Sequence, residues 1–142
     1  MKQEHLYAVA LTRLGGFNLP ALMELYQRAG SATAIYEHRN NIHDILPDAT
    51  QRLVETLENW DNVISFAERE LQYDEQNNIE VLCLNDENYP QRLRECPDAP
   101  IVLYKQGNVN LNKHRTLNII GTRNCTQYGR DLIRAFIREL KS

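Results

Sequence analysis

The chain has 142 residues, of which 42% are hydrophobic and 25% are charged, and its formal net charge is −3. This composition excludes an intrinsically disordered chain, and no apolar run reaches the roughly 18 residues that a membrane-spanning helix needs. The N-terminus also lacks the apolar stretch and the small-residue cleavage site of a secretory signal peptide, so we expect a cytoplasmic protein.

The first half of the chain predicts five short helices. Apolar residues at helical spacing indicate one helix that ends at Gly15-Gly16, and a second is expected from Leu19 to Arg28 with Pro20 in its first turn. Ser31 is a candidate N-cap for the third helix and Asp48 for the fourth. A fifth helix is expected over residues 61–73, and residues 1–75 together form a predicted helical accessory domain.

The first two predicted helices, joined by the sequence LGGFN, are typical of a helix-hairpin-helix unit. In DNA-binding versions of that unit, backbone N–H groups of the hairpin contact a phosphate. Residues 1–75, however, hold six Lys or Arg against twelve Asp or Glu, so this part of the chain repels a polyanion. The charge favours a structural or protein-facing role for these helices.

The second half of the chain predicts an α/β arrangement. Short β-rich runs occur at 79–84, 101–108 and 117–121, with a short helix near Pro90 and a longer one over residues 126–141. A buried strand flanked by helices requires parallel neighbours, so we expect residues 76–142 to be the first, incomplete part of a Rossmann-like parallel sheet. We therefore expect the 142 residues to come from a longer polypeptide.

The sequence LNIIGTRNCTQYG, residues 117–129, carries the strongest functional signal. Gly121 allows a sharp turn and close approach of a ligand, Thr122 supplies a hydroxyl, and Arg123 follows beside the free N–H groups of the next helix. Thr126 can cap that helix, and Gly129 removes a side chain where the helix would cross the sheet. The guanidinium, the hydroxyl and the amides together predict a phosphate site.

The last predicted helix is amphipathic. Its expected buried face consists of Leu132, Ile133, Phe136, Ile137 and Leu140. Beside that face runs a basic stripe made of Arg130, Arg134, Arg138 and Lys141. Residues 113–142 hold seven basic and two acidic residues, a net charge of +5, which leaves −8 for residues 1–112. An acidic partner is therefore expected at the C-terminal part.

The cysteine and histidine pattern predicts no metal centre. Cys83, Cys96 and Cys125 lack the C-x-x-C spacing of a zinc site and are interpreted as reduced thiols. The four histidines are scattered singly along the sequence. We also find no nucleophile–base pair and no carboxylate dyad, so the sequence predicts neither a catalytic centre nor a cofactor.

Two motifs are similar to those of the DNA-processing protein A family, also called DprA or Smf. The first has the family form YP-x-x-L-x-x-x-x-D-x-P-x-x-LY-x-x-G, matched here by Tyr89, Pro90, Leu93, Asp98, Pro100, Leu103, Tyr104 and Gly107. The second has the form G-[ST]-R-x-x-[ST]-x-YG, matched by Gly121, Thr122, Arg123, Thr126, Tyr128 and Gly129. The family's later glycine-rich segment is not among these residues, so the resemblance covers its N-terminal portion.

The resemblance implies a single-stranded-DNA-binding protein that protects incoming DNA and helps to load the recombinase RecA in natural transformation and homologous recombination. It implies a non-enzyme that binds DNA on a Rossmann-like domain and forms a homodimer through the later part of that domain. Arg123 would contact a phosphate, Gly121 and Thr122 would shape the pocket, and Thr126 and Arg130 would flank it. The helical domain would be an accessory module similar to a SAM or helix-hairpin-helix domain.

Two alternatives stay open. Cytokinin-activating phosphoribohydrolases are similar in having a Rossmann-like core and an arginine near a phosphate, so an enzyme acting on nucleotides is the second hypothesis. The third hypothesis treats residues 1–75 as an independent protein-interaction module. An unfinished sheet would also leave an apolar edge, for which we expect self-association.

Overall fold

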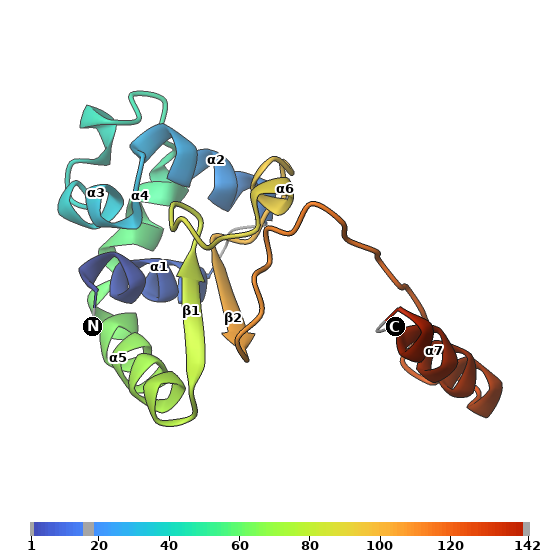
Figure 1. Ribbon diagram of the computed structural model, residues 1–142. Coiled ribbons are helices and arrows are strands. Elements are labelled where there is room, and N and C mark those ends of the chain that lie inside the picture. The colour runs from blue at the N-terminus through green and yellow to red at the C-terminus, as the bar shows by residue number, and fades with distance from the viewer. Residues whose placement is uncertain (1, 16–18, 141–142) are drawn as a thin grey trace. The chain divides into compact units, whose positions relative to one another are not determined.

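The computed structural model describes residues 2–15 and 19–140 and divides into two units, residues 1–112 and 113–142. In chain order, its elements (Figure 1) are α1 (Gln3–Arg13), α2 (Leu19–Ala29), α3 (Ala32–Glu37), the 3₁₀ turn η1 (Ile42–Asp44), α4 (Gln51–Glu58), α5 (Asp61–Gln76), β1 (Ile79–Cys83), α6 (Gln91–Arg94), β2 (Val102–Gln106) and α7 (Gln127–Glu139).

Helix α1 lies at the centre of the first unit, where it packs against α3, α5 and β1 (Figure 1). Its residues from Tyr7 to Leu11 are buried, and neither Ala8 nor Ala10 exposes any surface. Because these two side chains are small, the neighbouring elements approach the helix closely. The predicted first helix is therefore confirmed and forms the middle of the core.

The boundaries of the next helices follow local capping chemistry. Gly30 ends α2 with φ of +84°, and the Ser31 hydroxyl accepts a hydrogen bond of 3.0 Å from the Ala34 N–H at the start of α3, as predicted. The cap predicted at Asp48 is wrong, because α4 begins later and the Thr50 hydroxyl occupies the capping position. The predicted stop at Gly16, and the following Phe17-Asn18, lie outside the described residues.

Strands β1 and β2 confirm the two predicted strands at 79–84 and 101–108. They pair antiparallel, with a register from Ile79↔Gln106 to Cys83↔Val102, which corrects the parallel arrangement expected for this pair. A parallel pair needs a crossover that carries the chain back along the sheet, usually on a helix. The connection between these strands contains only the four-residue α6, and the chain instead reverses its direction.

The expected strand at residues 117–121 does not form. Within the described part of the chain, these residues pair with no neighbour, and Ile120 is 94% exposed. A strand is stabilised only when its backbone groups bond to an adjacent strand, and residues 113–140 contain no regular element besides α7. The structure therefore combines a helical N-terminal part with a small antiparallel sheet.

Candidate nucleic-acid interface

The predicted phosphate-site residues lie in the loop before α7 and in its first turn. The Thr126 hydroxyl caps α7 by accepting a hydrogen bond of 3.2 Å from the Gly129 N–H. The Thr122 hydroxyl donates to the carbonyl of Asn124 at 3.0 Å, which folds the loop back on itself. Thr126 therefore satisfies one of the free N–H groups at the start of α7 and leaves others available to an anion.

Two arginines flank this loop and differ in their contacts. The guanidinium of Arg130 donates to the carbonyl of Cys125 at 3.3 Å, so this side chain reaches back along the loop. Arg123 is exposed and has no hydrogen-bond or ion-pair partner among residues 2–15 and 19–140. Its five N–H donors are thus free to bind an external phosphate.

The two glycines of the motif lie in open surroundings. A Cβ added to Gly121 would meet nothing within 4 Å, so a ligand can approach its backbone from solvent. A Cβ added to Gly129 would lie 3.5 Å from the Thr126 hydroxyl, an ordinary van der Waals distance. The structure therefore gives no steric requirement for glycine at position 129, where the sequence pattern predicted a close helix crossing.

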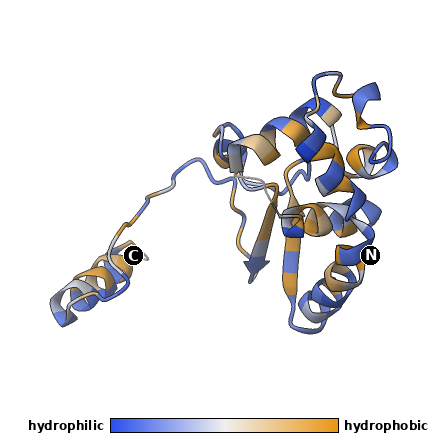
Figure 2. Ribbon diagram, turned by 180° about the vertical axis from the view of Figure 1, so that it is seen from behind, coloured by the Kyte–Doolittle hydropathy of each residue, from blue (hydrophilic) through white to orange (hydrophobic). Residues whose placement is uncertain are grey.

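The apolar face of α7 is exposed, which corrects the prediction that it is buried. Its members with their exposed fractions are Leu132 (56%), Ile133 (38%), Phe136 (40%), Ile137 (44%) and Leu140 (64%). Hydropathy colouring shows apolar and polar residues alternating along this helix (Figure 2). Residues 113–140, the described part of the second unit, contain no other helix or strand that could cover the face. None of the described helices is long and apolar enough to cross a bilayer.

The first sequence motif, by contrast, serves to hold the loop between β1 and β2 in place. The buried Tyr89 hydroxyl donates to the carbonyl of Pro100 at 2.6 Å. The Asn112 side chain accepts from the Gln91 N–H at 2.8 Å and donates to the Tyr89 carbonyl at 3.1 Å. Tyr89 therefore holds the loop closed, and its contacts with Asn112 fix the last residue of the first unit to this loop.

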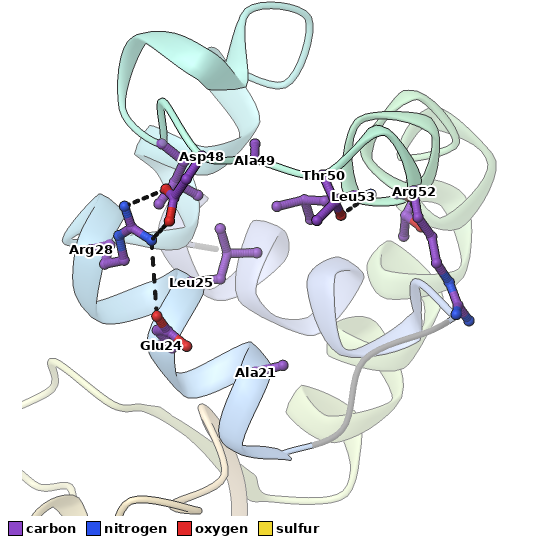
Figure 3. Close-up of a pocket in the computed structure, with 11 residues that line it drawn as sticks. Ala21, Glu24, Leu25, Arg28, Asp48, Ala49, Thr50, Arg52 and Leu53 are labelled. Carbon is purple, nitrogen blue, oxygen red and sulfur yellow. Dashed lines mark hydrogen bonds and ion pairs between the residues drawn. The ribbon is translucent and has the colours of Figure 1, made fainter.

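A pocket of about 300 Å³ lies between α2, α4 and the segment before α4 (Figure 3). At its rim Arg28 donates to both carboxylate oxygens of Asp48, at 2.6 and 3.1 Å, and lies 3.9 Å from Glu24. The hydrogen bond to Asp48 raises the pKa of Arg28, and the same contact lowers the pKa of Asp48. Because its charge is already compensated, Arg28 is a poorer anion ligand than Arg123.

The fold also brings together three residues that the sequence pattern did not connect. His5 of α1, Cys83 at the end of β1 and Asp86 in the following turn place one potential ligand atom each within 4.8 Å of one another. The histidine lies far from the other two along the chain, so no spacing motif could indicate the cluster. Only the packing of α1 against β1 shows it.

Comparison with known proteins relates the C-terminal part of the chain to a DNA-handling family. Residues 80–142 match the family described as DNA recombination-mediator protein A. The protein "DNA processing protein DprA" of Bacillus subtilis (strain 168) is 35% identical over 63 residues, which are 44% of this chain and 21% of that protein. The match thus spans about a fifth of the length of the curated relative. No solved structure matches the chain.

Proposed function

We propose that this protein, whose residues 80–142 match the family described as DNA recombination-mediator protein A, binds single-stranded DNA in DNA uptake and recombination. In this proposal it protects the incoming strand, in the cytoplasm, and helps a RecA-type recombinase to assemble on it. The family match and the relative from Bacillus subtilis support a general role in DNA processing. The strand specificity and the recombinase partner are the parts that experiments must test.

The observation that carries the proposal is the exposed guanidinium of Arg123 beside the start of α7. Unlike Arg28, it has no carboxylate partner in the described residues. In this proposal Gly121, Thr122, Thr126 and Arg130, which belong to the same loop and the first turn of α7, add open backbone, hydroxyls and a second positive charge to the site. A phosphate placed here would meet charge-assisted donors and the positive end of the helix dipole.

The negative charge of residues 1–75 disfavours DNA binding at the N-terminal part of the chain. Residues 1–75 carry twice as many acidic as basic residues, whereas residues 113–142 carry a net charge of +5. We therefore propose residues 1–75 as an accessory domain similar to a SAM or helix-hairpin-helix module. Residues 76–142 would be the first part of a Rossmann-like DNA-binding domain that forms a homodimer through its later residues.

The test is fluorescence anisotropy of a labelled single strand titrated with the full-length protein. We expect Arg123→Ala to weaken binding several-fold and Arg123→Glu to weaken it further, since the latter adds repulsion. The matched control is Arg52→Ala, which removes an exposed arginine from the acidic helices. Equal affinity of the Arg123 variants and the wild type would refute the assigned site.

A nucleotide phosphoribohydrolase could use the same arginine to hold a substrate phosphate. The two functions are distinguished by incubating the full-length protein with nucleoside monophosphates and measuring release of free base. Under our proposal no base is released. Base release that depends on Arg123 would replace the recombination function with the enzymatic one.

A further inference from the structure

The cluster of His5, Cys83 and Asp86 has the composition of a transition-metal site. The Nε2 atom of His5 lies 2.8 Å from Oδ2 of Asp86, and the ligand atoms of all three residues lie within 4.8 Å of one another. In a tetrahedral zinc site, the same kinds of ligand atoms are roughly 3.3–3.6 Å apart, because Zn–S bonds are about 2.3 Å and Zn–N bonds about 2.0 Å. Shifts of about an ångström or less would therefore accommodate the ion.

Asp86 is held in position by the surrounding backbone. Its Oδ2 accepts a hydrogen bond of 2.8 Å from the Cys83 N–H, and its own N–H donates to the Cys83 carbonyl at 2.8 Å. Its carbonyl accepts from the Tyr89 N–H at 3.0 Å and from the Arg94 guanidinium at 2.6 Å. Such supporting contacts orient a ligand before the metal arrives, which raises affinity.

The local charge also favours a cation. Burial is the largest cause that raises the pKa of the Cys83 thiol, the carboxylates of Asp86 and Glu4 raise it further, and the cation of Lys2 lowers it. Of these groups, the two carboxylates also attract a divalent ion. The ion can reach the cluster from solvent, because the side chains of His5 and Asp86 are 16% and 23% exposed. A pocket of about 300 Å³ that His5 helps to line adjoins it.

We propose that His5, Cys83 and Asp86 form a zinc site. The donor set of one sulfur, one imidazole nitrogen and one carboxylate oxygen suits Zn²⁺ better than Mg²⁺ or Ca²⁺, which prefer oxygen ligands alone. On binding, the Cys83 thiol releases its proton to solvent and the proton of the neutral His5 imidazole moves from Nε2 to Nδ1. The His5–Asp86 hydrogen bond is thereby replaced by two bonds to the metal. Three protein ligands leave a fourth position for water or another small ligand.

The proposal is independent of DNA binding, and its test uses metal alone. The full-length protein is dialysed against Zn²⁺, and the bound metal is measured by elemental analysis. In parallel, Co²⁺ replaces Zn²⁺ to report the thiolate-to-metal absorption band. We expect a saturable zinc site, a cobalt–thiolate band, and at least tenfold weaker binding in both Cys83→Ala and His5→Gln.

Two controls keep the test decisive. Cys125→Ala and His43→Gln remove an exposed thiol and an exposed imidazole outside the cluster, and both should bind metal as the wild type does. If circular dichroism shows that Cys83→Ala does not fold, metal binding by His5→Gln decides the test, because the glutamine amide can still form a hydrogen bond with Asp86. No bound metal in the wild type, or a cobalt band lost with Cys125 and kept without Cys83, overturns the proposal.

Discussion

The Tyr26 hydroxyl of α2 donates a 2.6 Å hydrogen bond to Oε1 of Glu4 on α1. The same carboxylate accepts from the N–H groups of Ala32 and Thr33 at 2.9 Å each and from the Thr33 hydroxyl at 2.6 Å. One half-buried carboxylate thus joins α1, α2 and the start of α3. Because its acceptor positions are used by donors from two other helices, Glu4 fixes how these three helices pack.

Glu4→Gln is expected to destabilise the fold by about 2 kcal/mol near neutral pH, since hydrogen bonds to charged groups are the stronger kind. Burial alone would raise the pKa of Glu4, but the bonds from Thr33, Tyr26 and Ala32 together lower it below its ordinary 4.5. Above pH 4.5, the ordinary pKa of a glutamate, the ionised Glu4 contributes its full stabilisation of the fold. This contribution is lost as the pH falls through the lower pKa that Glu4 has in the folded protein.

Urea unfolding of the wild type and the variant at neutral and at strongly acidic pH tests this prediction. The difference between them should shrink on acidification. The control is Glu37→Gln, an exposed carboxylate at the end of α3. A difference that is the same at both pH values would show that the charge of Glu4 is irrelevant.

Asp74→Asn is expected to stabilise the protein by about 1 kcal/mol near neutral pH. Asp74 is 4% exposed, and its Oδ2 has no hydrogen-bond partner in the described structure. Burial raises its pKa above the ordinary 3.8, and Glu70 adds to the shift. An acid whose pKa is raised in the folded state destabilises the fold at pH values above that raised pKa, where burial opposes its charge. At pH values below its ordinary pKa it is protonated in both states and has no such effect. The stability gained by Asp74→Asn should therefore vanish at acidic pH.

Thermal or urea unfolding over a pH series measures this effect, with Glu75→Gln as the control on the exposed side of α5. A loss of stability in Asp74→Asn near neutral pH would contradict the prediction. It would mean that the ionised carboxylate stabilises the fold.

Tyr89→Phe is expected to cost about 1.5 kcal/mol, because it leaves the Pro100 carbonyl without its 2.6 Å hydrogen bond. Tyr128→Phe changes a hydroxyl on a residue that is 76% exposed and should be neutral. Chemical denaturation of both variants compares a buried anchor with an exposed tyrosine. Similar costs for the two would reject the anchoring role of Tyr89.

Removal of Arg123 should also change the salt dependence of DNA binding. Each phosphate contact on a single strand contributes about −0.7 to the slope of log K against log salt concentration. Arg123→Ala should flatten the slope by about that amount, while Arg123→Lys should retain most of it. Anisotropy titrations at several salt concentrations measure the slope. A lower affinity with an unchanged slope would mean that Arg123 acts through loop structure and not through a phosphate.

Local chemistry made much of the fold predictable from sequence. Ser31 caps α3 and Gly30 ends α2 as expected, since a hydroxyl or a missing Cβ acts within a few residues. Asp48 misled the prediction because Arg28, on a different helix, binds its carboxylate and Thr50 takes the capping role. A competing tertiary partner is invisible to a local pattern.

Contacts between segments that are distant in the sequence could not be predicted from local patterns. The direction of pairing between β1 and β2 depends on how the chain reverses after Cys83, which strand propensity does not report. The cluster of His5 with Cys83 and Asp86 depends on the docking of α1 against β1. Arg123 lies in the loop that precedes α7, as the adjacent sequence predicts, and its role in phosphate binding stays a prediction.

Ala8 and Ala10 each have no exposed surface at the middle of α1. An added methyl group at either position would have to displace a neighbouring element, so α1 acts as a spacer whose thickness sets the distances around it. Relatives that keep this arrangement are therefore expected to retain alanine, glycine or serine at these two positions of α1.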